Sequence, residues 1–118
     1  MELALSFAES ARVEPESRQC LIDTALYVGR WLAERGKPGR WDCVEPEALL
    51  ASLAAPSPNE SERFMFYLVA LLGYAAINGR VAPPAAARSL HQIADMTHMT
   101  ATRDFAQSTV AQLQSVMS

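Results

Sequence analysis

Two histidines and an aspartate near the C-terminal end of the chain have side chains that readily bind a metal ion. His91, Asp95 and His98 are separated by four and three residues, and on an ideal helix they lie within a sector of about 60°. Imidazole nitrogen and carboxylate oxygen are both accepted by zinc. The set is incomplete, however, and its spacing matches no established zinc motif. We therefore prefer two surface histidines beside an apolar helix face, and a metal-dependent function at these three residues is the weakest alternative.

A second group of residues could bind an anion or a protein surface. Residues 30–40 contain four basic side chains opposed by Glu34 alone. Their formal charge is therefore +3, in a chain whose total is −3. Trp31 lies within this stretch and Trp41 directly follows it. Tryptophan and arginine are enriched in interface hot spots, and a guanidinium recognises carboxylates and phosphates.

The connection at residues 36–42 concentrates these groups. It contains two glycines and a proline, so turn conformations separate it from both flanking helices. One alternative is that Trp41 folds back and caps the core while the arginines are merely solvated. Another is a nucleic-acid or nucleotide-binding regulator that uses residues 30–41. The residues that we predict for binding a protein partner are Arg35, Lys37, Arg40 and Trp41.

The beginning of the chain is acidic. Its five acids are Glu2, Glu9, Glu14, Glu16 and Asp23. Such a surface could attract a basic partner, although a solvated acidic face is the simpler interpretation. The overall negative charge also argues against nucleic acid as a partner, because nucleic-acid-binding domains are usually basic.

Motifs of catalysis are missing from the sequence. There is no glycine-rich phosphate loop, nucleophile elbow, CxxC pair or HExxH helix. We therefore predict that the protein is not an enzyme and that it needs no cofactor or metal.

The cysteines and the first residues of the chain indicate the cellular compartment. Cys20 and Cys43 have neither the spacing of a metal site nor the number of a disulfide framework, so we predict two reduced thiols. The chain opens on an acid at position 2, without the basic and apolar regions of a signal peptide. Lys37 is the single lysine among ten basic residues, a bias associated with GC-rich bacterial genomes. We expect a cytoplasmic bacterial protein.

Helical periodicity defines the elements that must position all these residues. No stretch shows sustained alternation of β-branched and polar residues, so the predicted fold class is all-α. A chain of 118 residues fits one domain, and we predict a single-domain bundle of five to six helices over residues 1–118. The predicted helices cover residues 2–12, 15–35, 46–55, 58–78, 84–96 and 101–117.

The segment 58–78 is predicted to be the buried central helix. Ser57 and Glu60 have the spacing of a capping box, and Gly79 provides a stop. Residues 64–77 carry no charge, and their apolar side chains point in all directions, which indicates a buried helix. At about 1.5 Å per residue these fourteen residues cover about 21 Å, short of the ~30 Å hydrocarbon core of a membrane.

Two glycines lie inside predicted helices. Gly29 and Gly73 each cost ~1 kcal/mol of helix stability relative to alanine. Close packing against another helix would offset this cost. We therefore predict that the helices over 15–35 and 58–78 cross near these two residues.

The leading functional prediction is a small, non-enzymatic protein-binding module. Within this class we expect a bacterial inhibitor, an immunity protein, an antitoxin-like protein or a regulator that acts by occupying a partner protein. A homodimer or larger assembly is also predicted, because a chain of this length has a limited interior and at least five helices with apolar faces. The amphipathic side chains suited to such contacts are Tyr27, Trp31, Tyr67 and Tyr74.

Overall fold

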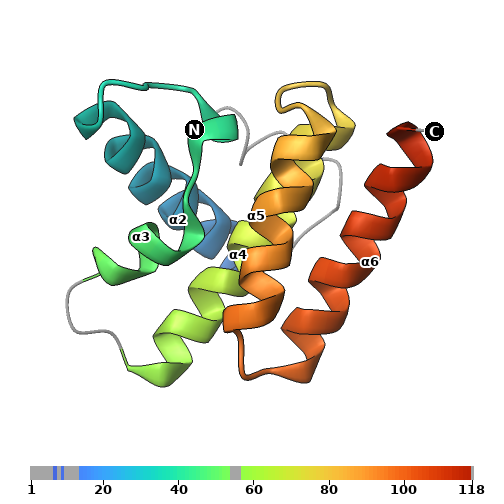
Figure 1. Ribbon diagram of the computed structural model, residues 1–118. Helices are drawn as coiled ribbons and strands as arrows, with labels where there is room; N and C mark the ends of the chain where they lie inside the picture. Colours follow the sequence, from blue (N-terminus) through green and yellow to red (C-terminus); the bar gives the residue numbers. More distant parts are fainter. Residues whose placement is uncertain (1–6, 8, 10–13, 54–56, 118) are drawn as a thin grey trace.

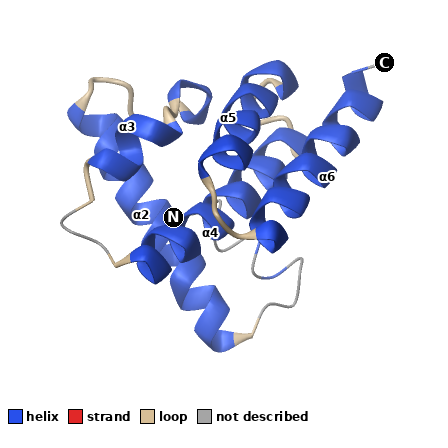
Figure 2. Cartoon of the chain, turned by 60° about the horizontal axis from the view of Figure 1, so that its bottom comes forward, coloured by secondary structure: helices blue, strands red, loops and turns tan. Residues whose placement is uncertain are grey.

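Helices make up nearly all the regular structure in the computed structural model of this protein, which describes residues 7, 9, 14–53 and 57–117. Across these residues the chain contains helices, turns and loops but no strand (Figure 2), so the predicted all-α class is confirmed. The predicted helix 2–12 lies outside the described residues except for Phe7 and Glu9, which are both helical. The elements are α2 (Pro15–Glu34), the 3-10 helix η1 (Trp41–Cys43), α3 (Pro46–Ala51), α4 (Pro58–Ile77), α5 (Pro83–Met96) and α6 (Thr100–Met117).

Prolines, glycines and one serine set most of the helix boundaries. A proline occupies the start of α2, α3, α4 and α5. At this position a backbone N–H would have no partner within the helix, so the N–H that proline lacks costs no hydrogen bond. The Ser57 hydroxyl accepts a hydrogen bond from the Glu60 amide at 3.2 Å, as the predicted capping box requires. Gly36 and Gly79 follow α2 and α4 with φ of 74°, the left-handed conformation that ends many helices.

The helix α3 is shorter than the predicted span of 46–55. It ends at Ala51, and Ser52 follows as its C-cap. The Ser52 hydroxyl donates to the Leu49 carbonyl at 2.6 Å, and such a bond competes with continuation of the helix. Residues 54–56 lie outside the described part of the chain. Leu49 itself is fully buried, and α3 packs against α5.

The central position of α4 is confirmed. It packs against α2, α5 and α6, and in Figure 1 it lies behind α5, with α2 on one side and α6 on the other. Nine of its residues are buried, and Leu68 and Leu72 have no exposed surface. The burial is not all round, because Phe66 and Ile77 are 40% and 59% exposed. Of the helices that the structure describes, none combines the length and apolar character needed to cross a membrane.

The helices α5 and α6 form an antiparallel hairpin on α4 (Figure 1). The Thr97 hydroxyl accepts from the Met99 amide at 3.1 Å, just before α6 begins at Thr100. The same hydroxyl donates to the Glu62 carboxylate, which also accepts from the His98 amide at 2.8 Å. A single carboxylate on α4 therefore holds the connection between α5 and α6.

The two helix glycines have different surroundings. A Cβ atom at Gly73 would lie 2.7 Å from Thr109 Cγ2, so a close helix contact at Gly73 is confirmed. The neighbour is α6, however, and not α2. A Cβ atom at Gly29 would meet nothing within 4 Å. The predicted crossing of α2 and α4 at these glycines is wrong, because α2 turns Leu21, Val28 and Leu32 to the core and leaves Gly29 outside it.

Candidate functional site

Arg40, one of the predicted partner-binding residues, is paired with its own chain. Its guanidinium makes two hydrogen bonds to the Asp42 carboxylate, with Nε–Oδ1 at 3.1 Å and Nη2–Oδ2 at 3.0 Å. These hydrogen bonds hold the pKa of Asp42 below its usual value and raise the pKa of Arg40. The bidentate pair leaves Arg40 less able to attract an external anion than its exposure suggests.

Arg35 and Lys37 lie on the same connection, just after α2. The Arg35 guanidinium carbon is 4.0 Å from the centre of the Trp31 ring, and its Nη1 is 4.0 Å from Glu45 Oε2. Lys37 is exposed, and its backbone closes the end of α2 by donating to the Leu32 carbonyl at 2.9 Å. The connection therefore carries less unpaired positive charge than the sequence alone indicates.

Trp41 is half-buried in η1 and packs against the hydrophobic core. The segment that follows it is tied to α5, because the Ser89 hydroxyl donates to the Val44 carbonyl at 3.2 Å. This arrangement fits the alternative in which Trp41 caps the core. A role for its remaining exposed edge in partner binding stays a prediction.

The three residues considered for a metal site do not form one. The helix α5 ends at Met96, and Thr97 adopts an extended conformation with ψ of 143°. His98 therefore leaves the helix that carries His91 and Asp95, and the predicted common sector does not arise. Among the residues that the structure describes, no group of three histidines, cysteines or acids has an arrangement that could hold a metal ion.

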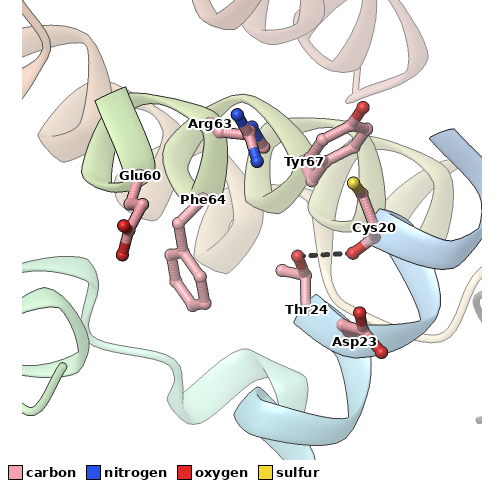
Figure 3. Close-up of a pocket in the computed structure, with 7 residues that line it drawn as sticks. All are labelled: Cys20, Asp23, Thr24, Glu60, Arg63, Phe64 and Tyr67. Carbon is pink, nitrogen blue, oxygen red and sulfur yellow. Dashed lines mark hydrogen bonds between the residues drawn. The ribbon is translucent and has the colours of Figure 1, made fainter. Parts of the chain in front are cut away.

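A polar pocket of about 210 Å³ lies between α2 and α4 (Figure 3). The Thr24 hydroxyl donates to the Cys20 carbonyl at 2.7 Å, so it is occupied within α2. The carboxylates of Asp23 and Glu60 come from different helices, α2 and α4, and lie at opposite sides of the view in Figure 3. No histidine lines the pocket to activate the thiol, and Cys20 and Cys43 are both free, as predicted. The lining residues are Cys20, Asp23, Thr24, Glu60, Arg63, Phe64 and Tyr67.

The described residues that line a second hollow surface are all uncharged, and we call this surface the apolar groove. It consists of two adjoining pockets of about 240 and 220 Å³ that share Phe7, Ala70 and Phe105. The first pocket is completed by Ser17, Leu21, Phe66 and Tyr67. The second is completed by Val69, Gly73, Tyr74, Ile77, Thr109 and Gln112.

Aromatic rings give the apolar groove its shape. Phe7 stands edge-on to Tyr74, with ring centres 5.2 Å apart. Phe66 lies 5.2 Å from Phe105 and 5.5 Å from Tyr67. Because Phe7 lines both pockets, its side chain marks the boundary between the two halves of the groove.

One face of α4 forms the floor of the groove. Phe66, Ala70, Gly73 and Ile77 follow the spacing i, i+4, i+7 and i+11, so they line up along one side of the helix over about 16 Å. The two large side chains at the ends are exposed, and the two small residues between them are buried. The sequence prediction missed this surface because it treated the uncharged run 64–77 as buried on every side. The two small residues, Ala70 and Gly73, between large residues at heptad spacing were the signal available.

The three surfaces differ in what they can bind. The connection after α2 has its arginines engaged within the chain, and the polar pocket has no histidine in its lining. The apolar groove alone combines exposed large side chains with an uncharged lining. No protein-family model matches this chain, and no curated protein or solved structure is significantly similar to it.

Proposed function

We propose that this protein is a non-enzymatic binding module that holds an amphipathic helix of another protein in the apolar groove. The observation that carries the proposal is the α4 face that ends in exposed Phe66 and Ile77, about three helical turns apart. Exposed large apolar side chains beside an apolar hollow are typical of a protein-interaction site. A helix lying along the groove would cover Phe66 and Ile77 with side chains from successive turns of one of its faces.

The chemistry of the lining selects the kind of partner. None of the described residues that line the two pockets is charged, so a phosphate or a charged peptide would lose hydration against them without a compensating ion pair. Phe7 shows that the groove accepts an aromatic ring on a helical residue. We therefore propose a partner helix that presents aromatic or large aliphatic side chains at positions i, i+3 or i+4, and i+7.

Within the class of binding modules we favour a bacterial inhibitor, an immunity or antitoxin-like protein, or a regulator, since each of these acts by occupying another protein. We place the protein in the cytoplasm, and the two free cysteines fit a reducing compartment.

The connection formed by Arg35, Lys37, Arg40 and Trp41 is the second candidate surface. The specific observation in its favour is the exposure of Lys37 in a turn where Gly36 and Gly39 both adopt the left-handed backbone conformation. A protein partner with an acidic patch would suit it better than nucleic acid, because the two arginines already face Glu45 and Asp42.

Selection from a library of random peptides tests the proposal directly. Peptides about 16 residues long form about four helical turns and can be selected on the immobilised protein. We expect enriched peptides to carry large apolar residues with helical spacing, and to show helical circular dichroism when bound. The double variant Phe66→Ser/Ile77→Ser should bind them at least about tenfold more weakly, because hot-spot side chains contribute ~2 kcal/mol or more.

The control variant is Lys37→Glu, which should bind the same peptides as the wild type does. Both variants should retain the circular dichroism of the folded wild type, because the three residues are exposed. If the groove variant binds the selected peptides as tightly as the wild type, the groove is not the site. If Lys37→Glu loses them instead, the connection after α2 is the binding surface.

A further inference from the structure

The apolar groove already holds one side chain of this chain at its middle. Phe7 is helical and half-buried, and it packs against the hydrophobic core. Its ring stands edge-on to Tyr74, with ring centres 5.2 Å apart. Phe66 lines the first pocket and Ile77 the second, whereas Phe7 lines both. Phe7 therefore lies between the two exposed residues that carry the proposed function.

Phe7 differs in origin from the two other described residues that line both pockets. Ala70 belongs to α4, and Phe105 belongs to α6, where its ring lies 5.2 Å from that of Phe66. The helices α4 and α6 pack directly against each other. Phe7 comes from the part of the chain before α2. Its ring can therefore leave the groove while the floor and the α6 wall keep their places.

The ring of Phe7 divides a space that one ligand would need whole. The floor between Phe66 and Ile77 is low, because Ala70 and Gly73 carry at most one methyl group each. The pockets of about 240 and 220 Å³ are each smaller than the ~300–1,000 Å³ usual for a binding pocket, and together they fall within that range. A helix that reaches from Phe66 to Ile77 is continuous, so its side chains have to pass through the space of the Phe7 ring.

We propose that Phe7 closes the apolar groove from within, and that a partner helix binds by displacing it. This inference rests on the proposed function, because the ring and the partner compete for one site. In the closed state Phe7 packs on Tyr74. In the open state the partner lies along the whole α4 face. The observed affinity for the partner is then lowered by the fraction of molecules that are open.

The sequence around Phe7 is that of a competitor that a partner can outdo. In the predicted helix 2–12, the face of Phe7 carries Leu3 four residues before it, and Ser10 and Ala11 after it. The segment thus offers two large apolar side chains, whereas the proposed partner offers three. Because the segment belongs to the same chain, its effective concentration at the groove is high even when its contact is weak. Closure and displacement are therefore both expected.

The sign of the effect of Phe7→Ala tests the competition. The probe is a helical peptide selected on the immobilised protein. If the groove is closed in at least about nine-tenths of the molecules, Phe7→Ala should bind this peptide at least about tenfold more tightly than the wild type does. If Phe7 were instead a wall that contacts the peptide, its loss would weaken binding. Unchanged or weaker binding by Phe7→Ala overturns the proposal.

Nuclear magnetic resonance follows the displacement in the wild-type protein. The edge-on rings of Phe7 and Tyr74 bring their ring protons close together, so the free protein should show a nuclear Overhauser effect between them. Saturation with the selected peptide should abolish this signal. Tyr27 and Phe64, also edge-on with ring centres 5.6 Å apart, are the matched control and should keep theirs. A signal between Phe7 and Tyr74 that persists at saturation shows that the ring stays in place, and rejects displacement.

An uncharged dye tests the closure without any partner helix. Nile red fluoresces in apolar surroundings, so Phe7→Ala should bind more of it than the wild type does. The triple variant Phe7→Ala/Phe66→Ser/Ile77→Ser should lose this gain, because the opened groove is no longer apolar at its ends. No gain for Phe7→Ala, or a gain that survives in the triple variant, contradicts closure of the groove by Phe7.

The dye and the peptides separate the failure of this inference from the failure of the proposed function. If no helical peptide is selected but the dye shows the expected gain and its loss, helix binding fails while closure by Phe7 stands. If selected peptides need Phe66 and Ile77 but bind Phe7→Ala no more tightly than the wild type, helix binding stands and the competition by Phe7 is wrong.

Discussion

Thr109 determines how closely α6 approaches α4. Its Oγ1 donates to the Phe105 carbonyl at 2.8 Å, which fixes the rotamer and directs Cγ2 at the α-carbon of Gly73. A side chain at position 73 would have to displace that methyl group, and rotation of Thr109 would give up its hydrogen bond. The pair explains why a poor helix former is tolerated in the middle of the most important helix of the fold.

We predict that Gly73→Ala destabilises the protein, because the new Cβ atom would lie 2.7 Å from Thr109 Cγ2. Overpacking of this kind typically costs ~1–3 kcal/mol. The double variant Gly73→Ala/Thr109→Ser keeps the hydroxyl and removes the methyl group, so it should recover most of the lost stability. Urea unfolding at low protein concentration measures all three free energies of unfolding.

Gly29→Ala serves as the matched control for this prediction. Its Cβ atom has open space, so the same substitution should raise the stability of the dilute protein by ~1 kcal/mol. Equal effects of the two substitutions, in either direction, would mean that helix propensity and not packing decides both.

At the scale of the elements, α4 carries most of the core and part of the binding surface. Its buried side is lined by leucines without exposed surface, while its opposite side ends in exposed Phe66 and Ile77. The start and stop of this helix were predictable, because Ser57, Glu60 and Gly79 act through local hydrogen bonds and local backbone conformation. Its exposed side was not, because that depends on where α2 and α6 leave a gap.

We predict that Leu68→Ala or Leu72→Ala lowers the free energy of unfolding by ~2–5 kcal/mol, the usual cost of emptying a fully buried leucine site. Both leucines are 0% exposed. Ile77→Ala, at a 59% exposed position of the same helix, should change stability by no more than ~0.5 kcal/mol. Thermal and urea unfolding measure these changes in the free energy of unfolding. Similar losses of stability at all three positions would refute the packing described for α4.

At the scale of the whole molecule, the helices could be predicted from the sequence but their neighbours could not. Periodicity and caps act within a few residues, and they placed α2, α4, α5 and α6 to within one or two residues of the observed bounds. The partner of Gly73 turned out to be α6, which no local pattern could show, since contacts between helices depend on the path of the intervening chain.

The candidate site was likewise predictable only where it depends on residues close together in the sequence. Sequence charge pointed to Arg35 and Arg40, but a formal charge does not reveal that a neighbour such as Asp42 has already taken the hydrogen bonds. The apolar groove arises from residues as distant in sequence as Phe7, Phe66 and Phe105. Such a surface is visible only after the helices are assembled.

The Glu62 carboxylate also has a consequence for the kinetics of amide hydrogen exchange. An exposed loop amide normally exchanges quickly with solvent, yet the amide of His98 donates to a side chain on another helix. Its exchange then requires the hairpin of α5 and α6 to separate from α4 at this point. Glu62→Ala should accelerate exchange at His98 by at least about tenfold, since a hydrogen bond to a charged group contributes ~1.5–3 kcal/mol. Glu60→Ala should leave the exchange rate at His98 unchanged. Nuclear magnetic resonance can follow the amide proton of His98, and its exchange rate then reports how often the hairpin separates from α4.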